Sequence, residues 1–307
     1  MLTEQTYDWE TLPHPSLHHC KQDLPPLSKW QMWHRFWNCT LSKYGIFILL
    51  PILLFTAIGP SLSEYPYDAL HLTHINQPPS SQFWFGTDDL GRDIFTRIWY
   101  GARISLSVGI LAALIDLGIG LIWGGAAGLA GGRFDEILMR FADILYSLPH
   151  LLVIILLTVL LGSGMIPLLI AITITGWVTM ARIVRGQVKL LKQMDFVLAA
   201  KAFGASQSRL LFVHLLPNAM GPILITLTLT IPSAIFAETF LSFLGLGIQA
   251  PQASWGTMAN EGLPALEYFP WRIFFPGFFM SMTLLSFHLI GEGLKSAFDQ
   301  SQDQGYA

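Results

Sequence analysis

Six long apolar segments dominate this sequence of 307 residues and restrict what it can fold into. An α-helix needs about 20 apolar residues to cross the hydrocarbon core of a bilayer, and it satisfies its own backbone polar groups there. The segments lie near Tyr44–Leu62, Ser105–Ala130, Ile137–Leu161, Met165–Ile183, Met220–Leu246 and Ile273–Leu294. We therefore predict an all-α membrane protein with six transmembrane helices.

The composition agrees with a chain that is solvated mainly by lipid. Of its residues 52% are hydrophobic and only 12% are charged, whereas a soluble domain carries about 25% charged residues. A net charge of −3 argues against a nucleic-acid-binding protein. The histidines near the start, His14, His18 and His19, have no Cys or carboxylate at a recognised ligand spacing, so we predict no metal site.

The basic residues predict how the chain is oriented. If six helices alternate, one side of the membrane receives the basic residues Lys21, Lys29, Arg35, Lys43, Arg133, Arg140, Arg182, Arg185, Lys189, Lys192, Lys201, Arg209 and Lys295. The other side receives Arg92, Arg97, Arg103 and Arg272. Because cytoplasmic loops carry the excess of Lys and Arg, both termini and the loop 187–217 are predicted to be cytoplasmic.

These expectations divide the chain into four parts. Residues 1–43 form a cytoplasmic N-terminal tail, because the first apolar segment begins too late for a signal peptide. Residues 44–104 hold the first span and an extracytoplasmic loop with an interfacial helix. Residues 105–296 form the transmembrane core with the cytoplasmic loop 187–217. Residues 297–307 are a cytoplasmic C-terminal tail.

The loop between the fourth and fifth apolar segments is longer and more polar than a simple connection needs. Gln187–Phe203 has a helix-forming composition, and Gly204 can adopt backbone angles that end a helix and turn the chain. Ser206 is a suitable N-cap for a second helix over Gln207–Leu215, which Pro217 should stop. The pattern predicts a protruding helix–Gly–helix knob for docking a soluble partner, and the alternative is an ordinary amphipathic connector.

This segment resembles the cytoplasmic coupling loop of ABC importer permeases. In that family Glu-Ala-Ala is followed after three residues by Gly. Nine residues later comes an apolar residue or His, and Leu-Pro follows after one further residue. The residues that match are Ala199, Ala200, Gly204, His214, Leu216 and Pro217, whereas Leu198 stands in place of the Glu. The resemblance implies an ATPase-docking surface formed by Leu198, Ala199, Ala200, Lys201, Gly204, Ala205, Ser206, Arg209, His214 and Pro217.

Three further motifs resemble the C-type permease of oligopeptide and dipeptide importers. The first contains Gly-Thr-Asp-x-x-Gly-Arg-Asp at residues 86–93, where Thr87 or Asp88 could cap an interfacial helix. The second spans Glu238–Gly256 and contains Leu-Ser-Phe-Leu-Gly-Leu-Gly. The third combines Phe275–Gly277 with Gly291–Asp299. Together the motifs extend over most of residues 85–299.

The resemblance implies a type I ABC importer permease fold in a bacterial inner membrane. The chain would be a non-catalytic pore subunit without a bound cofactor, since Gly293–Ser296 lacks the spacing of a phosphate-binding loop. Its partners would be a sister permease, two ATP-binding cassette ATPases that use ATP and Mg, an extracytoplasmic substrate-binding protein and membrane lipid. Peptide is the implied substrate, and nickel or another small solute is the alternative. An ion-coupled secondary transporter and an intramembrane enzyme are rival classes.

Four polar residues fall inside or near the predicted spans, where a charge is costly. They are Asp116, Glu238, His288 and Glu292. They could line a translocation path, or they could form hydrogen bonds within the helix bundle. Arg140 and Asp143, three residues apart, are predicted to form a structural ion pair.

Overall fold

The computed structural model describes residues 29–298. The three N-terminal histidines, residues 1–28 of the predicted N-terminal tail and residues 299–307 of the C-terminal tail lie outside them. Within the described residues the regular elements are helices, and one isolated antiparallel bridge joins Thr87 to Asp93. The prediction of an all-α protein is confirmed.

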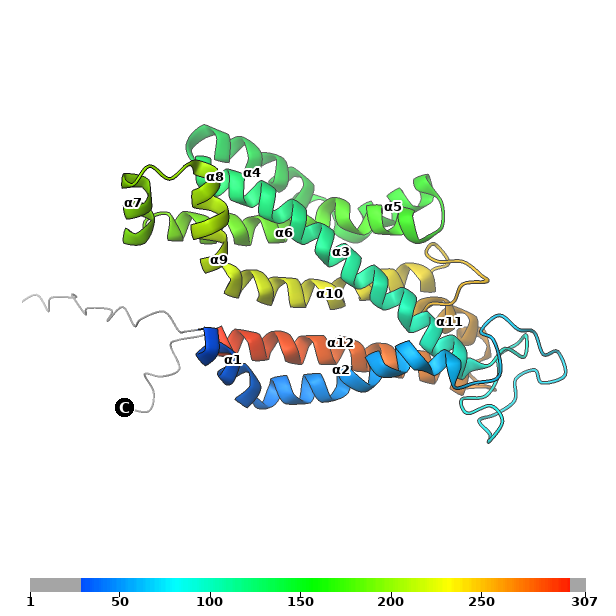
Figure 1. Ribbon diagram of the computed structural model, residues 1–307. Helices are drawn as coiled ribbons and strands as arrows, with labels where there is room; N and C mark the ends of the chain where they lie inside the picture. Colours follow the sequence, from blue (N-terminus) through cyan, green and yellow to red (C-terminus); the bar gives the residue numbers. More distant parts are fainter. Residues whose placement is uncertain (1–28, 299–307) are drawn as a thin grey trace, which may run out of the picture.

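Five helices are long and apolar enough to cross a membrane, and a bent pair adds a sixth span if the pair is counted as one. The five are α2 (Thr40–Ile58, extended by the 3₁₀ turn η2, Gly59–Ser61), α3 (Ile94–Ala130), α6 (Met165–Leu191), α10 (Met220–Phe243) and α12 (Trp271–Phe298). The pair is α4 (Gly132–Ser147) with α5 (His150–Leu161), and together these run between the same two ends of the bundle as the other spans (Figure 1).

The third predicted span is not a single helix. The axes of α4 and α5 meet at 82°, with a break at Leu148 and Pro149. Leu148 is extended, with ψ 137°, because a proline disfavours helical angles in the residue before it. The expected continuous helix over Ile137–Leu161 was therefore wrong, and Pro149 is the physical reason.

The second span begins earlier than its apolar run indicates. α3 starts at Ile94, and the side chain of Asp93 caps it by accepting from the backbone N–H groups of Phe95 and Thr96. Neither Thr87 nor Asp88 caps a helix, and the region expected to form a separate interfacial helix is the first part of α3. With 37 residues at about 1.5 Å each, α3 is longer than the roughly 30 Å hydrocarbon core.

The two ends of the bundle differ (Figure 1). One end, the knob end, carries α7 (Asp195–Ala202), α8 (Gln207–Arg209) and α9 (Leu216–Asn218), together with α1 (Lys29–Asn38) and the last turn of α12. The other end, the loop end, carries residues 59–93, α11 (Trp255–Gly262) and the 3₁₀ turn η4 (Leu263–Ala265). The first and last described residues therefore lie at the same end as the knob.

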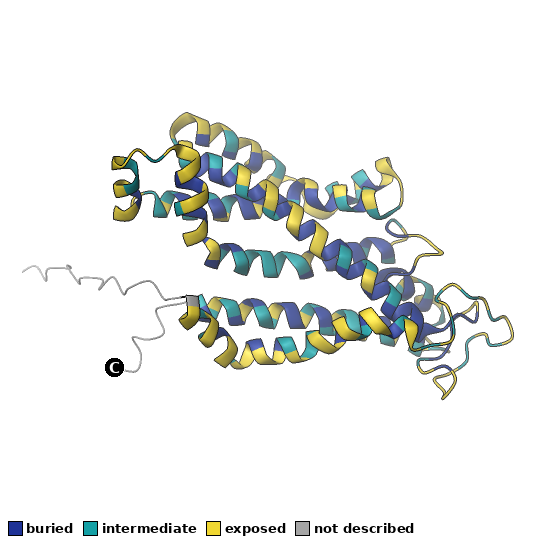
Figure 2. Cartoon of the chain, viewed as in Figure 1, coloured by how far each residue is buried: buried dark blue, intermediate teal, exposed yellow. Residues whose placement is uncertain are grey.

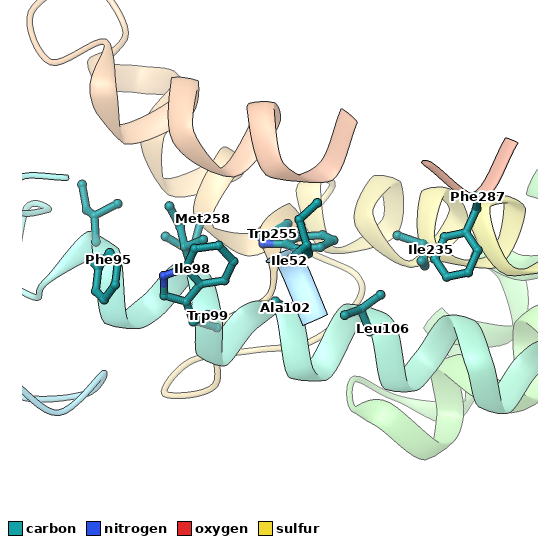
Figure 3. Close-up of a cluster of buried hydrophobic side chains, with 12 residues drawn as sticks. Ile52, Phe95, Ile98, Trp99, Ala102, Leu106, Ile235, Trp255, Met258 and Phe287 are labelled. Atoms are coloured by element: carbon teal, nitrogen blue, oxygen red, sulfur yellow. The ribbon is translucent and has the colours of Figure 1, made fainter. Parts of the chain in front are cut away.

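Buried side chains concentrate between the helices, and the outward faces expose many apolar ones (Figure 2). Phe47 is 76% exposed, Leu160 71% and Ile122 69%. Large apolar side chains on the outside are expected where lipid is the solvent. A cluster at the loop end packs Phe95, Ile98 and Trp99 of α3 near Trp255 and Met258 of α11 (Figure 3).

The most extensive helix–helix packing is that of α3 against α6, and glycines allow the two helices to approach closely. Gly120, Gly124 and Gly128 recur every fourth residue on one face of α3, and we call them the glycine seam. A Cβ added at Gly124 would lie 2.2 Å from the carbonyl oxygen of Ala181. Small residues at this spacing allow membrane helices to pack backbone against backbone. This Gly-x-x-x-Gly-x-x-x-Gly pattern is visible in the sequence but was not among the predicted features.

Candidate functional sites: a surface knob and a central cavity

The knob is residues 195–218, and it begins after a break in the chain. α6 ends at Leu191, and a turn over Lys192–Met194 separates it from α7. The single helix expected over Gln187–Phe203 was therefore wrong. Val197 anchors α7, because its fully buried side chain belongs to the same apolar cluster as Leu210 and Leu215.

Gly204 turns the chain at the tip of the knob, as predicted. Its φ is +79°, a conformation that side-chain-bearing residues rarely adopt. The N–H of Ala205 donates to the carbonyl of Ala200 at 3.0 Å, and the N–H of Gly204 donates to that of Lys201 at 2.9 Å. These bonds satisfy the last carbonyls of α7. Apart from Gly204 itself and its two chain neighbours, no atom of the described residues lies within 4 Å of a Cβ built at Gly204, so the backbone angle, not space, requires glycine there.

The second half of the knob is a helix with a widened turn. The hydroxyl of Ser206 accepts from the N–H of Arg209, which confirms it as the N-cap. α8 passes into a π-helical turn, η3 (Leu210–Leu215), and then into α9. Pro217 lies inside this helical run, which ends only after Asn218. A proline ring clashes with the carbonyl four residues back, and the wider π turn is one way to accommodate it.

The structure brings all ten predicted docking residues onto this one protrusion, and none of them is buried. Leu198, Ala199, Gly204, Ser206, Arg209 and Pro217 are exposed, and Ala200, Lys201, Ala205 and His214 are half-buried. Large apolar side chains accompany them: Phe203 is 92% exposed, Phe212 61% and Val213 56%. Such a concentration of exposed apolar surface marks an interaction site. Phe203, Phe212 and Val213 were not singled out from the sequence.

The buried side of the knob is fixed to the spans. Leu210, Leu211 and Leu215 share an apolar cluster with Met180, Val184 and Val188 of α6. Leu211 also packs against the face of α3 that holds Gly125. A force on the knob would therefore reach α3 and α6 directly.

Ion pairs join α4 to α6 near the same end. Asp135, which is 3% exposed, contacts both Arg185 and Lys189. Asp143 pairs with Arg182 at 2.7 Å and not with Arg140, so the predicted local pair was wrong. Asp143 meets Arg182 because α4 packs against α6. Residue spacing within α4 alone does not predict this contact between two helices.

A second charged cluster, the loop-end clamp, consists of Asp88, Arg92, Arg97, Glu261 and Arg272. Asp88 pairs with Arg92 at 2.6 Å and with Arg97 at 3.1 Å. Glu261 pairs with the same two arginines, at 2.9 Å and 2.8 Å. Arg272 donates to the carbonyl of Glu261 at 2.8 Å. The clamp fastens the loop 59–93 to α3, α11 and α12, and the charged Gly-Thr-Asp motif was its only sequence signal.

Replacing Arg97 by Met should destabilise the protein by about 3–5 kcal/mol. The carboxylates of Asp88 and Glu261 would each lose one of two arginine partners and would share Arg92 alone. The side chain of Arg97 is 2% exposed and that of Asp88 is 6% exposed. Thermal unfolding of the purified protein would measure the effect. The matched control is Arg182→Met, which breaks an exposed pair and should cost about 0–1 kcal/mol. Equal melting temperatures for the two variants would contradict a structural role for the clamp.

The central cavity lies between α3, the α4–α5 bend, α6 and α10. Its volume is about 670 Å³, and its lining comprises Asp116, Leu145, Tyr146, Leu148, His150, Ile172, Thr175, Gly176, Thr179, Ile183, Thr226, Leu229, Thr230, Ser233 and Ala234. Asp116 is 2% exposed, and its Oδ1 has no hydrogen-bond partner among the described residues. Of the four polar residues singled out from the sequence, Asp116 is the one that lines this cavity.

The other three are placed differently. Glu238 is fully buried and accepts from Ser105 at 2.7 Å and from Ser242 at 2.8 Å, so it ties α10 to α3. His288 contacts the carbonyl of Leu284 in its own helix. Glu292 pairs with Lys295 at 3.5 Å, and both are exposed. His288 and Glu292 lie on α12 and not in the cavity lining.

Comparison with known proteins identifies the family. The profile described as "Binding-protein-dependent transport system inner membrane component" matches residues 117–304. The profile described as "N-terminal TM domain of oligopeptide transport permease C" matches residues 28–79.

Curated relatives align with this chain over most of its length. The oligopeptide transport system permease protein OppC of Bacillus subtilis (strain 168) is 56% identical over 86% of this chain and 87% of its own length. The dipeptide permease DppC of that strain is 56% identical over 90% of this chain and 87% of its own length. OppC of Escherichia coli (strain K12) is 38% identical over 91% and 93%. The chain therefore belongs to the family of binding-protein-dependent transport system inner-membrane components, as a multi-pass permease of its oligopeptide and dipeptide branch.

Proposed function

We propose that this chain is one of two membrane subunits of an ATP-driven importer that takes up peptides. The observation that carries the proposal is the knob, a protrusion with an exposed apolar surface and a buried side that packs against α3 and α6. The relatives' names, oligopeptide and dipeptide permease, support peptide as the substrate. A sister permease would complete the path, and an extracytoplasmic binding protein would deliver the substrate.

The basic residues support a cytoplasmic position for the knob end. Among the described residues, the basic residues of that half of the bundle are Lys29, Arg35, Lys43, Arg133, Arg140, Arg182, Arg185, Lys189, Lys192, Lys201, Arg209 and Lys295. The loop end holds Arg92, Arg97, Arg103 and Arg272. Since an excess of Lys and Arg stays in the cytoplasm, both termini and the knob would lie there, beside the ATPase subunits.

The mechanism that fits this arrangement is alternating access. ATP and Mg bind to the partner ATPases, whose closure moves the knob. The apolar cluster that joins Leu210 and Leu215 to Val184 and Val188 transmits this movement to α6, and the glycine seam carries it to α3. The cavity lies between those helices and α10, so their rocking would open it to one side of the membrane and then to the other.

The test is uptake into proteoliposomes that contain this chain with its sister permease and ATPases, with the binding protein outside. We expect radiolabelled trialanine to accumulate only with internal ATP and to stop with vanadate. Uptake without ATP, or uptake that vanadate leaves intact, would contradict an ABC importer and favour ion-coupled transport. A parallel assay with Ni²⁺ separates peptide from nickel as the substrate, and we expect no accumulation of the metal.

A further inference from the structure

Asp116 is a buried carboxyl group with no ion-pair partner among residues 29–298, and His150 is the one other titratable side chain besides Tyr146 in the lining of its cavity. None of the described residues that line its cavity is Lys or Arg. No hydrogen bond reaches its Oδ1 from the described residues. A charged carboxylate at membrane depth costs several kcal/mol unless it meets a cation or a polar cavity. The cavity therefore presents an unpartnered carboxyl group, and a cationic ligand would stabilise its ionised form.

The wall of the cavity that α10 forms offers acceptors. On α10 the hydroxyl of Thr226 donates to the carbonyl of Pro222 at 2.8 Å, that of Thr230 to Thr226 at 2.9 Å, and that of Ser233 to Leu229 at 3.0 Å. Each hydroxyl hydrogen is thereby used within the helix, and the oxygen lone pairs are left to accept. All three residues line the cavity. A cavity lined by both a carboxyl group and several acceptor oxygens suits a ligand that is cationic and carries several hydrogen-bond donors.

Gly176 of α6 makes room for the carboxylate. A Cβ at this position would lie 2.4 Å from Oδ2 of Asp116. The carboxylate thus packs directly on the backbone of α6, one helix turn beyond the glycine seam, and any larger residue would displace it. The position of Asp116 is set by the packing of α3 on α6.

We propose that Asp116 is the counter-ion for the terminal ammonium group of the transported peptide, with hydroxyl oxygens of α10 accepting its remaining hydrogens. This inference rests on the proposed function. A primary ammonium carries three donors and one positive charge, which matches one carboxylate and neighbouring acceptors. A volume of about 670 Å³ exceeds what an ammonium group fills and falls in the range of small-ligand sites, so adjoining peptide atoms fit beside it.

Two peptides that differ only at the amino terminus test the proposal. The complete importer is purified in detergent, and its thermal shift is titrated with trialanine and with N-acetyl-trialanine. We expect trialanine to stabilise the wild-type assembly at concentrations about 10- to 100-fold lower than the acetylated peptide, because acetylation removes a charge-assisted interaction. Asp116→Asn should abolish this difference. Equal titrations of the two peptides on the wild type, or no shift with either, would overturn the site.

Uptake by the same variants separates this site from the function as a whole. We expect Asp116→Asn and Gly176→Ala to raise the KM for trialanine about 10- to 100-fold. The matched control Glu136→Gln removes an exposed carboxylate of α4 outside the cavity and should leave the KM unchanged. The Asn variant should keep the wild-type melting temperature, because it replaces a buried carboxyl group that forms no ion pair among the described residues by an amide of similar size. Normal trialanine uptake by Asp116→Asn would contradict the ammonium site alone. A wild-type importer that takes up no peptide would contradict the proposed function as well.

Discussion

Replacing Phe203 by Asp is expected to separate this subunit from its ATPase and to reduce ATP-driven uptake to background. Phe203 is 92% exposed and adjoins the turn at Gly204. An aromatic side chain that fills a partner's pocket typically contributes 2–4 kcal/mol, and a carboxylate buried there adds a desolvation penalty. We therefore expect the affinity for the ATPase to fall about 30- to 1,000-fold or more. Co-purification of the ATPase with the tagged permease would measure this loss.

The control for that variant is Tyr268→Asp. Tyr268 is 72% exposed in the connection between η4 and α12 at the loop end. The two variants make a similar chemical change at opposite ends of the bundle, so the control should retain the ATPase. Both should keep the wild-type melting temperature, because an exposed side chain is removed in each. Co-purification that Phe203→Asp leaves intact would show that the knob is not the ATPase contact.

A second variant addresses the shape of the knob. Proline at position 204 would need φ near −65° where the chain has +79°, and it would remove the N–H that donates to Lys201. Gly204→Pro should therefore disorder the tip and weaken ATPase binding, with the spans intact. Leu198 is 51% exposed, so a charge there is sterically tolerated and should also reduce an apolar contact.

Features that depend on local chemistry were predictable from the sequence. Apolar length identifies a span without knowledge of its neighbours, and Gly204 and Ser206 end and begin helices through their own backbone angles and hydrogen bonds. Partnerships across the fold were not predictable in this way. Asp88 meets Arg97 within one segment, but Glu261 reaches the same arginine from 164 residues away. The lack of a charged partner for Asp116 likewise depends on the packing of α4, α5, α6 and α10 around it, which the sequence alone does not give.

The glycine seam links the knob to the cavity. Asp116, Gly120, Gly124 and Gly128 follow one another at intervals of four along α3, and each faces α6. Towards the knob the two helices touch through glycines. Towards the cavity the contact ends at Asp116, whose carboxylate occupies the space beside Gly176. The close approach of α3 and α6 at the glycine seam therefore determines how the two helices move together and where the carboxylate of Asp116 lies.

Replacing Gly124 by Val should accordingly be among the most damaging single changes in the spans. Its Cβ would lie 2.2 Å from the carbonyl oxygen of Ala181, and that atom is backbone and cannot rotate away. The helices would have to separate, and overpacking of this kind costs about 1–3 kcal/mol, or more where backbone must move. We expect a lower melting temperature together with a loss of peptide uptake, since both the cavity and the link to the knob are disturbed.

Gly118→Val is the matched control, because it places the same β-branched side chain in the same helix. No atom outside the local helix lies within 4 Å of a Cβ at Gly118, which is exposed. Any change in helix propensity is shared by the two variants, so the difference between them reports the contact with α6 alone. Melting temperatures and uptake that fall equally in both would show that helix propensity, and not the seam, limits what α3 tolerates.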